Sequence, residues 1–119
     1  NPAESVAILK QFDDRLAHVH INDNYRLWDD DMIVGSIRTI AFLEFFYWLN
    51  KTGYDGWVTV DQFPYREDGR DAVAESVAWL QYLDALVENA DATVIQNVLD
   101  QHDGIESSRL ARRLLKMDV

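Results

Sequence analysis

The sequence contains no cysteine, only two prolines and five scattered glycines among its 119 residues. The absence of cysteine excludes disulfide bonds, thiolate metal ligands and a cysteine nucleophile, and it fits a reducing compartment such as the cytoplasm. Because the glycines stand alone, neither a phosphate-binding glycine loop nor a Gly-x-Ser-x-Gly nucleophile turn is present. No apolar run approaches the roughly 20 residues that a membrane-spanning helix needs.

Basic residues are also scarce, because 11 Lys and Arg stand against 21 Asp and Glu and the formal net charge is −10. Binding to nucleic acid or to an anionic membrane requires clustered Lys and Arg, so the composition disfavours both kinds of partner. Four of the basic residues crowd the C-terminal tail, namely Arg109, Arg112, Arg113 and Lys116. We interpret them as the solvated face of a helix rather than a binding patch.

The remaining composition is that of a globular protein, with 48% hydrophobic residues that include four Trp, five Tyr and five Phe. The hydrophobic periodicity predicts helices that alternate with strands, followed by two short amphipathic helices. The expected helices cover residues 1–11, 37–51, 70–88, 91–101 and 105–116, and the expected strands cover residues 16–21 and 57–62. We expect residues 1–88 to form one body, and residues 89–119 to form a helical extension that packs against it or against a second subunit.

Local signals mark the ends of these elements. Asn1, followed by a proline, predicts a helix start, and Asp13 with Asp14 predicts the end of that helix. Ser36 predicts the cap of the second helix, whose many aromatic residues we assign to the core, and Gly53 predicts its end. The third long helix is expected to face the core with a stripe at helical spacing, namely Val73, Val77, Leu80, Leu83 and Val87.

Polar side chains gather where both predicted strands end. His18, His20 and Asn22 alternate with apolar residues and therefore share one face of the first strand, and Asp61 ends the polar face of the second. Three consecutive acids, residues 29–31, lie in the long loop that follows the first strand. Alternating helices and strands imply neighbouring parallel strands, whose carboxyl ends meet at one edge of the sheet. The sequence therefore predicts a polar site at this edge.

These side chains could bind divalent cations. His20 and Asp61 could converge on one ion, and Asp29 and Asp31 could hold a second. Imidazole with carboxylate suits Mn, Fe, Co or Zn, and additional oxygen ligands shift the preference towards Mg or Mn. The spacing alone equally allows another interpretation, in which His20 is a hydrogen-bonded histidine of the core and the acids form a solvated loop.

The motifs just described, together with residues 53–64, resemble the C-terminal part of xylose-isomerase-like TIM barrels. Among these, the L-rhamnose isomerase and related bacterial sugar isomerases are most similar, and the tagatose 3-epimerase branch is more distant. The resemblance covers residues 1–88 and implies an α/β fold, the C-terminal portion of a (β/α)8 barrel, followed by short C-terminal helices. It also implies that an aldose and a ketose of a small sugar are interconverted with the help of divalent metal ions.

The resemblance also implies roles for individual residues. His20 and Asp61 correspond to ligands of the first metal on strands seven and eight of such barrels. Asp29 and Asp31 correspond to ligands of the second, catalytic metal and its water, and Arg26 lies where epimerase relatives place a substrate-contacting arginine. Mn²⁺ is the metal that we expect first, with Mg²⁺, Co²⁺ or Zn²⁺ as alternatives.

Several parts of the family pattern have no counterpart in this sequence. The Glu and Asp ligands of earlier strands, and the Asp-x-x-His pattern before His20, are missing, and only two of the eight strands of such a barrel are expected. We therefore expect a fragment that is inactive alone and assembles as a homo-oligomer or with a missing N-terminal part. Two alternatives are a non-catalytic module that acts in oligomerisation or protein interaction, and a hydrolase or lyase on the same barrel.

Overall fold

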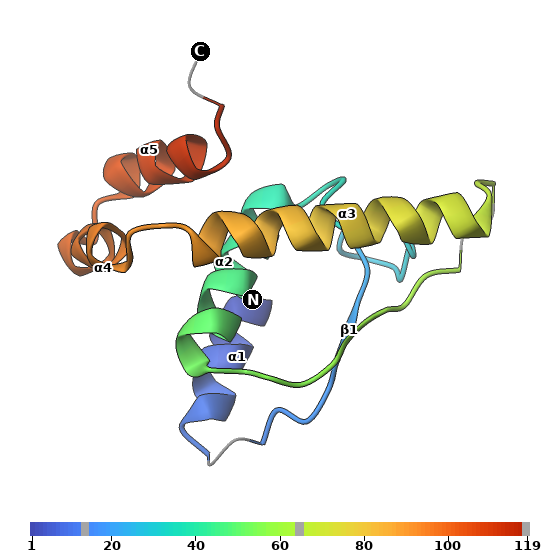
Figure 1. Ribbon diagram of the computed structural model, residues 1–119, viewed down its shortest axis with the longest axis horizontal. Coiled ribbons are helices and arrows are strands. Elements are labelled where there is room, and N and C mark those ends of the chain that lie inside the picture. The colour runs from blue at the N-terminus through green and yellow to red at the C-terminus, as the bar shows by residue number, and fades with distance from the viewer. Residues whose placement is uncertain (13–14, 64–65, 118–119) are drawn as a thin grey trace.

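A computed structural model describes residues 1–12, 15–63 and 66–117 (Figure 1). The predicted end of the first helix at Asp13 and Asp14 lies outside the described residues. The elements follow the predicted order of helices and strands. They are α1 (Pro2–Lys10), β1 (Val19–Ile21), α2 (Thr39–Thr52), β2 (Val58–Val60), α3 (Gly69–Glu88), α4 (Ala92–Gln101) and α5 (Gly104–Leu114).

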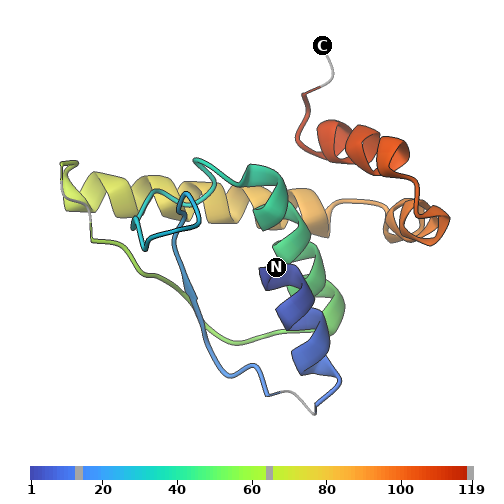
Figure 2. The same ribbon diagram turned by 180° about the vertical axis from the view of Figure 1, so that it is seen from behind.

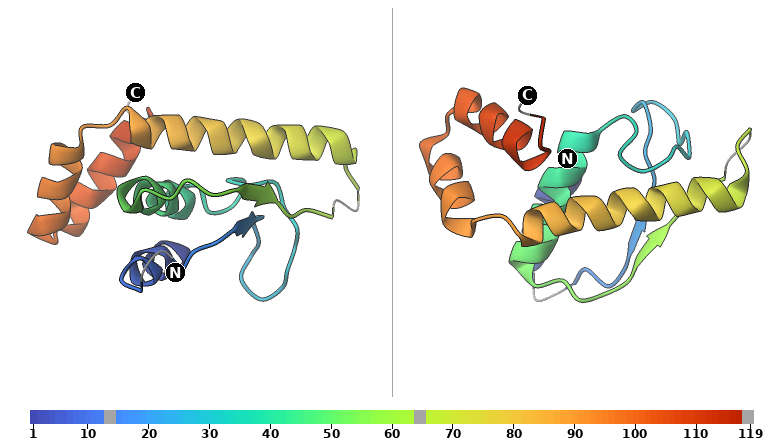
Figure 3. Two further views of the ribbon diagram at one scale, coloured as in Figure 1. Left: turned by 60° about the horizontal axis from the view of Figure 1, so that its bottom comes forward. Right: turned by 45° about the horizontal axis from the view of Figure 1, so that its top comes forward.

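The two strands form a parallel sheet, as predicted (Figure 3). In the register of the sheet, His20 lies opposite Thr59, with Val19 opposite Val58. Both strands are shorter than predicted, with three residues each. The backbone ladder continues by one hydrogen bond at its carboxyl end, where the amide of Asp61 donates to the carbonyl of Ile21 at 2.9 Å. The segment after each strand therefore starts from the same edge of the sheet.

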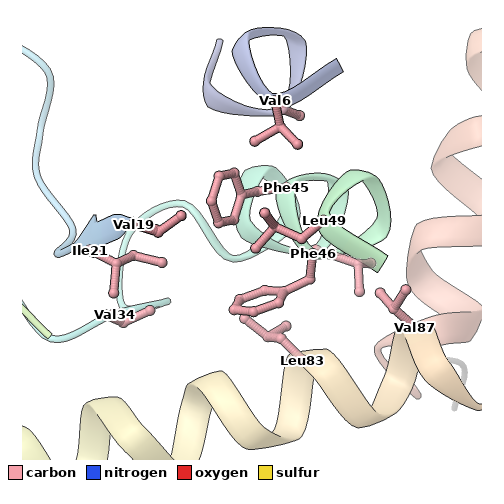
Figure 4. Packing of buried hydrophobic residues seen from close by; sticks show 11 residues of the cluster. Val6, Val19, Ile21, Val34, Phe45, Phe46, Leu49, Leu83 and Val87 are labelled. Carbon is pink, nitrogen blue, oxygen red and sulfur yellow. The ribbon is translucent and has the colours of Figure 1, made fainter. Parts of the chain in front are cut away.

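The core lies where α2 is held between α1 and α3 (Figure 4). Val6 of α1 packs towards one side of α2, and Leu83 of α3 packs towards Phe46 on the other side. Val19 and Ile21 of β1 are buried against this cluster, whereas His20 between them is exposed. The predicted alternation in the first strand is therefore confirmed, and the helices cover only the apolar face of the sheet.

The start of α2 differs from the prediction. The helix begins at Thr39 rather than residue 37, and Ser36 is exposed and does not cap it. The N-cap position is held by Arg38 without a side-chain cap, and the carboxylate of Asp23 accepts the amide hydrogens of residues 37 and 38 instead. The end of the helix agrees with the prediction, because Gly53 adopts a left-handed conformation with φ of 70°.

The buried face of α3 also differs from the predicted stripe. Leu83 and Val87 are buried as expected, but Val73 and Val77 are exposed. Their places in the core are taken by small neighbours, Ala72 and Ser76. Small side chains on this face allow the loop before α2 to approach closely, and the amide of Val34 donates to Ser76 Oγ at 3.1 Å.

The two predicted C-terminal helices are present and form a hairpin beyond the carboxyl end of α3 (Figure 1, Figure 2). Asp91 caps α4 and Asp103 caps α5, each by accepting two amide hydrogens of its own helix. Helix α4 buries Ile95 and Val98, whereas α5 buries no residue. Among the described residues, no helix is long and apolar enough to span a membrane.

Candidate functional site

The open face of the sheet carries two side-chain pairs, each joining β1 to β2. His18 Nε2 lies 2.7 Å from Thr59 Oγ1, and His20 Nδ1 lies 3.4 Å from Asp61 Oδ2. The parallel register produces both pairs, because each histidine reaches the residue that lies further along the neighbouring strand. The rings of His18 and His20 also contact each other edge to face, with centroids 4.8 Å apart. The structure thus brings His20 and Asp61 together as predicted.

This pair is open to solvent, with side-chain exposures of 59% for His20 and 63% for Asp61. His20 is therefore not a histidine of the hydrophobic core, which contradicts that part of the alternative interpretation, whereas Asp29 is exposed as the solvated-loop part expects. A contact this exposed to solvent contributes little to stability. The exposed nitrogen and oxygen atoms remain accessible to a ligand.

The second predicted pair lies in the loop between β1 and α2, residues 22–38, here called the acid loop. The side-chain amide of Asn22 donates to Asp29 Oδ1 at 2.8 Å and to Asp31 Oδ1 at 3.1 Å. Asp31 adopts a positive φ of 50°, which is uncommon for a residue other than glycine. Backbone strain of this kind persists only where the surroundings hold it, and it is often found at functional positions. The structure therefore brings Asp29 and Asp31 together, as predicted.

The acid loop and β2 meet at the same edge of the sheet. Gln62, the neighbour of Asp61, donates from Nε2 to the backbone carbonyl of Asp31 at 3.5 Å. The side-chain oxygen of the same Gln62 is held from α3, because Ser76 Oγ donates to Gln62 Oε1 at 2.7 Å. Both candidate pairs therefore lie on neighbouring segments that the buried side chain of Ser76 ties together.

Two further charged residues of the loop, Asp30 and Arg26, are held differently. Asp30 accepts the amide hydrogen of Tyr25 at 2.8 Å and so stabilises the loop itself. Arg26 is exposed, has a φ of 106°, and donates from its backbone to Asn24 Oδ1 at 2.9 Å. It lines an open cavity of about 660 Å³ together with Asn24 and Arg38.

Sequence reasoning missed Asp23 and the bridging role of Asn22. Asp23 is 1% exposed and is the only charged residue in the buried set of the described chain. A signal for it existed, because Asp23 continues the period-two series of Val19 and Ile21 on the inward face of β1. The bridging role of Asn22 had no such signal, since it depends on the backbone conformation at Asp31.

The donor types at this edge fit a divalent cation only in part. One imidazole with one carboxylate, and two carboxylates, are the ligands that borderline and hard cations prefer. However, no three His, Asp or Glu side chains of the described residues converge into one group that could hold a metal ion. Each pair would therefore need further ligands from outside these residues to complete a coordination shell.

Comparisons with known proteins identify the family of this chain. Residues 2–83 match the family model described as Xylose isomerase-like TIM barrel. Over 88 residues the chain is 32% identical to the Uncharacterized protein MJ1311 of Methanocaldococcus jannaschii. That alignment covers 74% of this chain and 28% of the relative, so the chain spans less than a third of the relative's length. The chain belongs to the xylose isomerase-like TIM barrel family.

Proposed function

We propose that this chain supplies the carboxyl-terminal part of a divalent-metal-dependent sugar isomerase that interconverts an aldose and a ketose. The sequence motifs favour an enzyme of the L-rhamnose isomerase type. The observation that carries the proposal is the meeting of two donor pairs at one edge, His20 with Asp61 and Asp29 with Asp31. Function in parallel α/β folds collects at the carboxyl ends of the strands, which is where both pairs lie.

In this proposal each pair has its own role. His20 and Asp61 would hold one cation, and Asp29 and Asp31 would hold a second. A divalent cation, when bound, supplies Lewis-acid chemistry at carbonyl and hydroxyl oxygens of a sugar. Arg26 would donate hydrogen bonds to the substrate from the rim of the site. We expect Mn²⁺ first, with Mg²⁺, Co²⁺ or Zn²⁺ as alternatives, because nitrogen and oxygen ligands are mixed.

We further propose that residues 1–88 form the partial barrel, that residues 89–119 form an extension, and that the 119-residue chain alone is inactive. The incomplete ligand sets support this, as do Leu27 and Trp28 in the acid loop, which are 86% and 77% exposed. Further strands, from a preceding segment or from a second copy, would cover them and add ligands. The proposed partner is a small sugar rather than nucleic acid or membrane, and the proposed location is the cytoplasm.

A second candidate function is a non-catalytic module that acts in oligomerisation. An apolar cavity of about 450 Å³ between α2 and the α4–α5 hairpin favours it. Its lining includes Leu43 of α2, Val98 of α4, and Leu110 and Leu114 of α5. Sedimentation of the chain would test this candidate, since a module of this kind associates at micromolar concentration whether or not a metal is present.

The experiment that tests the metal-dependent function is a calorimetric titration of the 119-residue chain with Mn²⁺. A double variant, His20→Ala with Asp61→Ala, removes the first pair, and Asp29→Asn with Asp31→Asn removes the second. The matched control is Glu75→Gln with Glu88→Gln, which removes two exposed acids of α3.

We expect measurable Mn²⁺ binding, weaker than at a complete site because each pair lacks further ligands, that each site variant weakens and that the control retains. Equal binding by all four proteins would overturn the proposal. A positive result would justify assaying aldoses and ketoses with the complete barrel, where hydrolysis or elimination products would indicate a different reaction on the same fold.

A further inference from the structure

Both oxygens of the buried carboxylate of Asp23 accept hydrogen bonds from backbone amides. Oδ1 accepts the amide hydrogen of Asn24 at 2.9 Å. Oδ2 accepts those of Ile37 at 2.8 Å and Arg38 at 3.0 Å. A carboxylate without such partners is costly to bury, so three hydrogen bonds are what make this position possible. The bonds are also directional, and they fix the backbone at three points around one side chain.

Two of these points lie at the start of α2. The first amide groups of a helix have no partner within the helix, and the positive end of its dipole attracts an anion. Asp23 places its charge at this end of α2, because it accepts the amide hydrogens of the N-cap residue Arg38 and of Ile37 just before it, 15 and 14 residues away. The end of β1 and the beginning of α2 are therefore joined directly, which fixes both ends of the acid loop.

The backbone of Asp23 fixes a third feature of the loop. Its amide donates to the carbonyl of Met32 at 3.0 Å, and the amide of Met32 donates back at 2.9 Å. This pair of backbone hydrogen bonds between Asp23 and Met32, here called the neck, closes the loop. Asn22 directly precedes Asp23 in the chain, and Asp31 directly precedes Met32. The bonds from Asn22 to Asp29 and Asp31 are therefore made directly beside the neck.

We propose that Asp23 is the positioning residue of the Asp29–Asp31 carboxylate pair. Its side chain sets the distance between β1 and α2, its backbone closes the neck, and Asn22 can then hold both carboxylates on one side of the loop. Asp23 itself contacts neither a cation nor a substrate, because it is 1% exposed. The inference rests on the proposed function for the role of the pair, but its geometric part can be tested without any metal.

The test uses Asp23→Asn in the 119-residue chain, which keeps the shape but turns an amide donor towards backbone donors. Amide hydrogen exchange of residues 24–36 is the first readout, and the side-chain amide resonance of Asn22 is the second. We expect exchange in this segment to become about 100-fold faster than in the unmodified chain. We also expect the Asn22 side-chain signal to lose the downfield shift that hydrogen bonding to two carboxylates produces.

The matched control is Val87→Ala, which weakens the core at the end of the cluster that lies away from Val34 of the acid loop (Figure 4). This control should accelerate exchange broadly, and the Asn22 signal should remain as in the unmodified chain. If Asp23→Asn does not fold, the same measurements on Asp23→Ser, which retains one acceptor oxygen, replace it. The inference is overturned if exchange in residues 24–36 rises no more than in the control, or if the Asn22 signal is retained.

A Mn²⁺ titration separates this inference from the proposed function. If Asp29 and Asp31 hold a cation, Asp23→Asn should weaken that binding step by about 10- to 100-fold and leave the His20 and Asp61 step unchanged. If the unmodified chain binds no Mn²⁺ at Asp29 and Asp31, the proposed function fails. The exchange data and the Asn22 signal then still decide whether Asp23 positions the two carboxylates.

Discussion

The acid loop and the α4–α5 hairpin are ordered in opposite ways. Between Asn24 and Arg38 the loop contains no helix and no named strand, yet Val34 within it is completely buried and Asp23 at its neck is almost so. The hairpin is almost entirely helical, yet α5 buries no residue. Regular local structure and firm attachment to the body are therefore separate properties. Attachment depends on buried contacts with other elements.

The aspartates that bind backbone amides also differ between the two regions: those of the hairpin act locally, and that of the acid loop acts over a long range. Asp91 and Asp103 each accept amide hydrogens two and three residues further along their own helices. Asp23 accepts the amide hydrogens of residues 37 and 38, which lie at the far end of the acid loop, directly before α2. A local cap stabilises one helix by about 1 kcal/mol. The long-range cap stabilises the arrangement of two elements, so its loss should affect the whole molecule.

The largest effect is expected for Asp23→Ala. Removing the carboxylate leaves three backbone donors without partners in a buried place, and we expect the free energy of unfolding to fall by about 3 kcal/mol. Urea denaturation followed by tryptophan fluorescence would measure it. A loss below about 1 kcal/mol would show that water replaces the carboxylate and that the loop does not depend on it.

The next effect is expected for Ser76→Ala, the second anchor of the acid loop. Ser76 Oγ accepts from the amide of Val34 and donates to Gln62, and both bonds are buried or partly buried. We expect a loss of about 1.5 kcal/mol in the same denaturation experiment. Ser108→Ala on the exposed part of α5 is the matched control and should change nothing measurable. Equal losses for the two serines would contradict the difference between the regions.

A smaller and more local effect is expected for Asp103→Ala. Loss of this cap should destabilise α5 by about 1 kcal/mol and accelerate amide exchange in α5. The midpoint of global unfolding should stay nearly in place, because no residue of α5 is fully buried and Leu114, which packs against the core, is only partly buried. Far-UV circular dichroism with residue-resolved exchange would measure both quantities. A midpoint shift as large as that of Asp23→Ala would show that the hairpin is firmly attached after all.

The smallest effect is expected for Leu110→Ala in α5. Leu110 is only partly buried and lines the cavity beside α2, so few contacts are lost and we expect less than about 1 kcal/mol. Leu83→Ala in the core between α2 and α3 is the reference, with an expected loss of about 3 kcal/mol. Similar losses at both leucines would mean that the cavity is closed in solution.

Most of the fold could be predicted from the sequence because its signals are local. The cap at Asn1, the left-handed end at Gly53 and the alternation in β1 each depend on a few neighbouring residues. The parallel pairing of β1 with β2 followed from the helix between them, and the approach of His20 to Asp61 followed from that pairing. These features require no knowledge of distant contacts.

The features that could not be predicted depend on distant contacts. Ser36 has the right chemistry for a helix cap, but Asp23 already occupies the start of α2 from the neighbouring strand. Val77 fits a helical stripe better than Ser76, but Ser76 faces the acid loop and meets its backbone. The metal-binding roles of His20, Asp61, Asp29 and Asp31 stay predictions, and so does the substrate contact of Arg26.

The neck between Asp23 and Met32 has a consequence for how this protein could be altered. The paired backbone hydrogen bonds between Asp23 and Met32 separate residues 24–31 from the rest of the acid loop. The two ends of this segment are held side by side. Segments enclosed in this way can change in length and composition with little disturbance of the scaffold beneath them. Residues 24–31 therefore form a replaceable cassette, and exchanging it as a unit would give the same scaffold a different set of ligands.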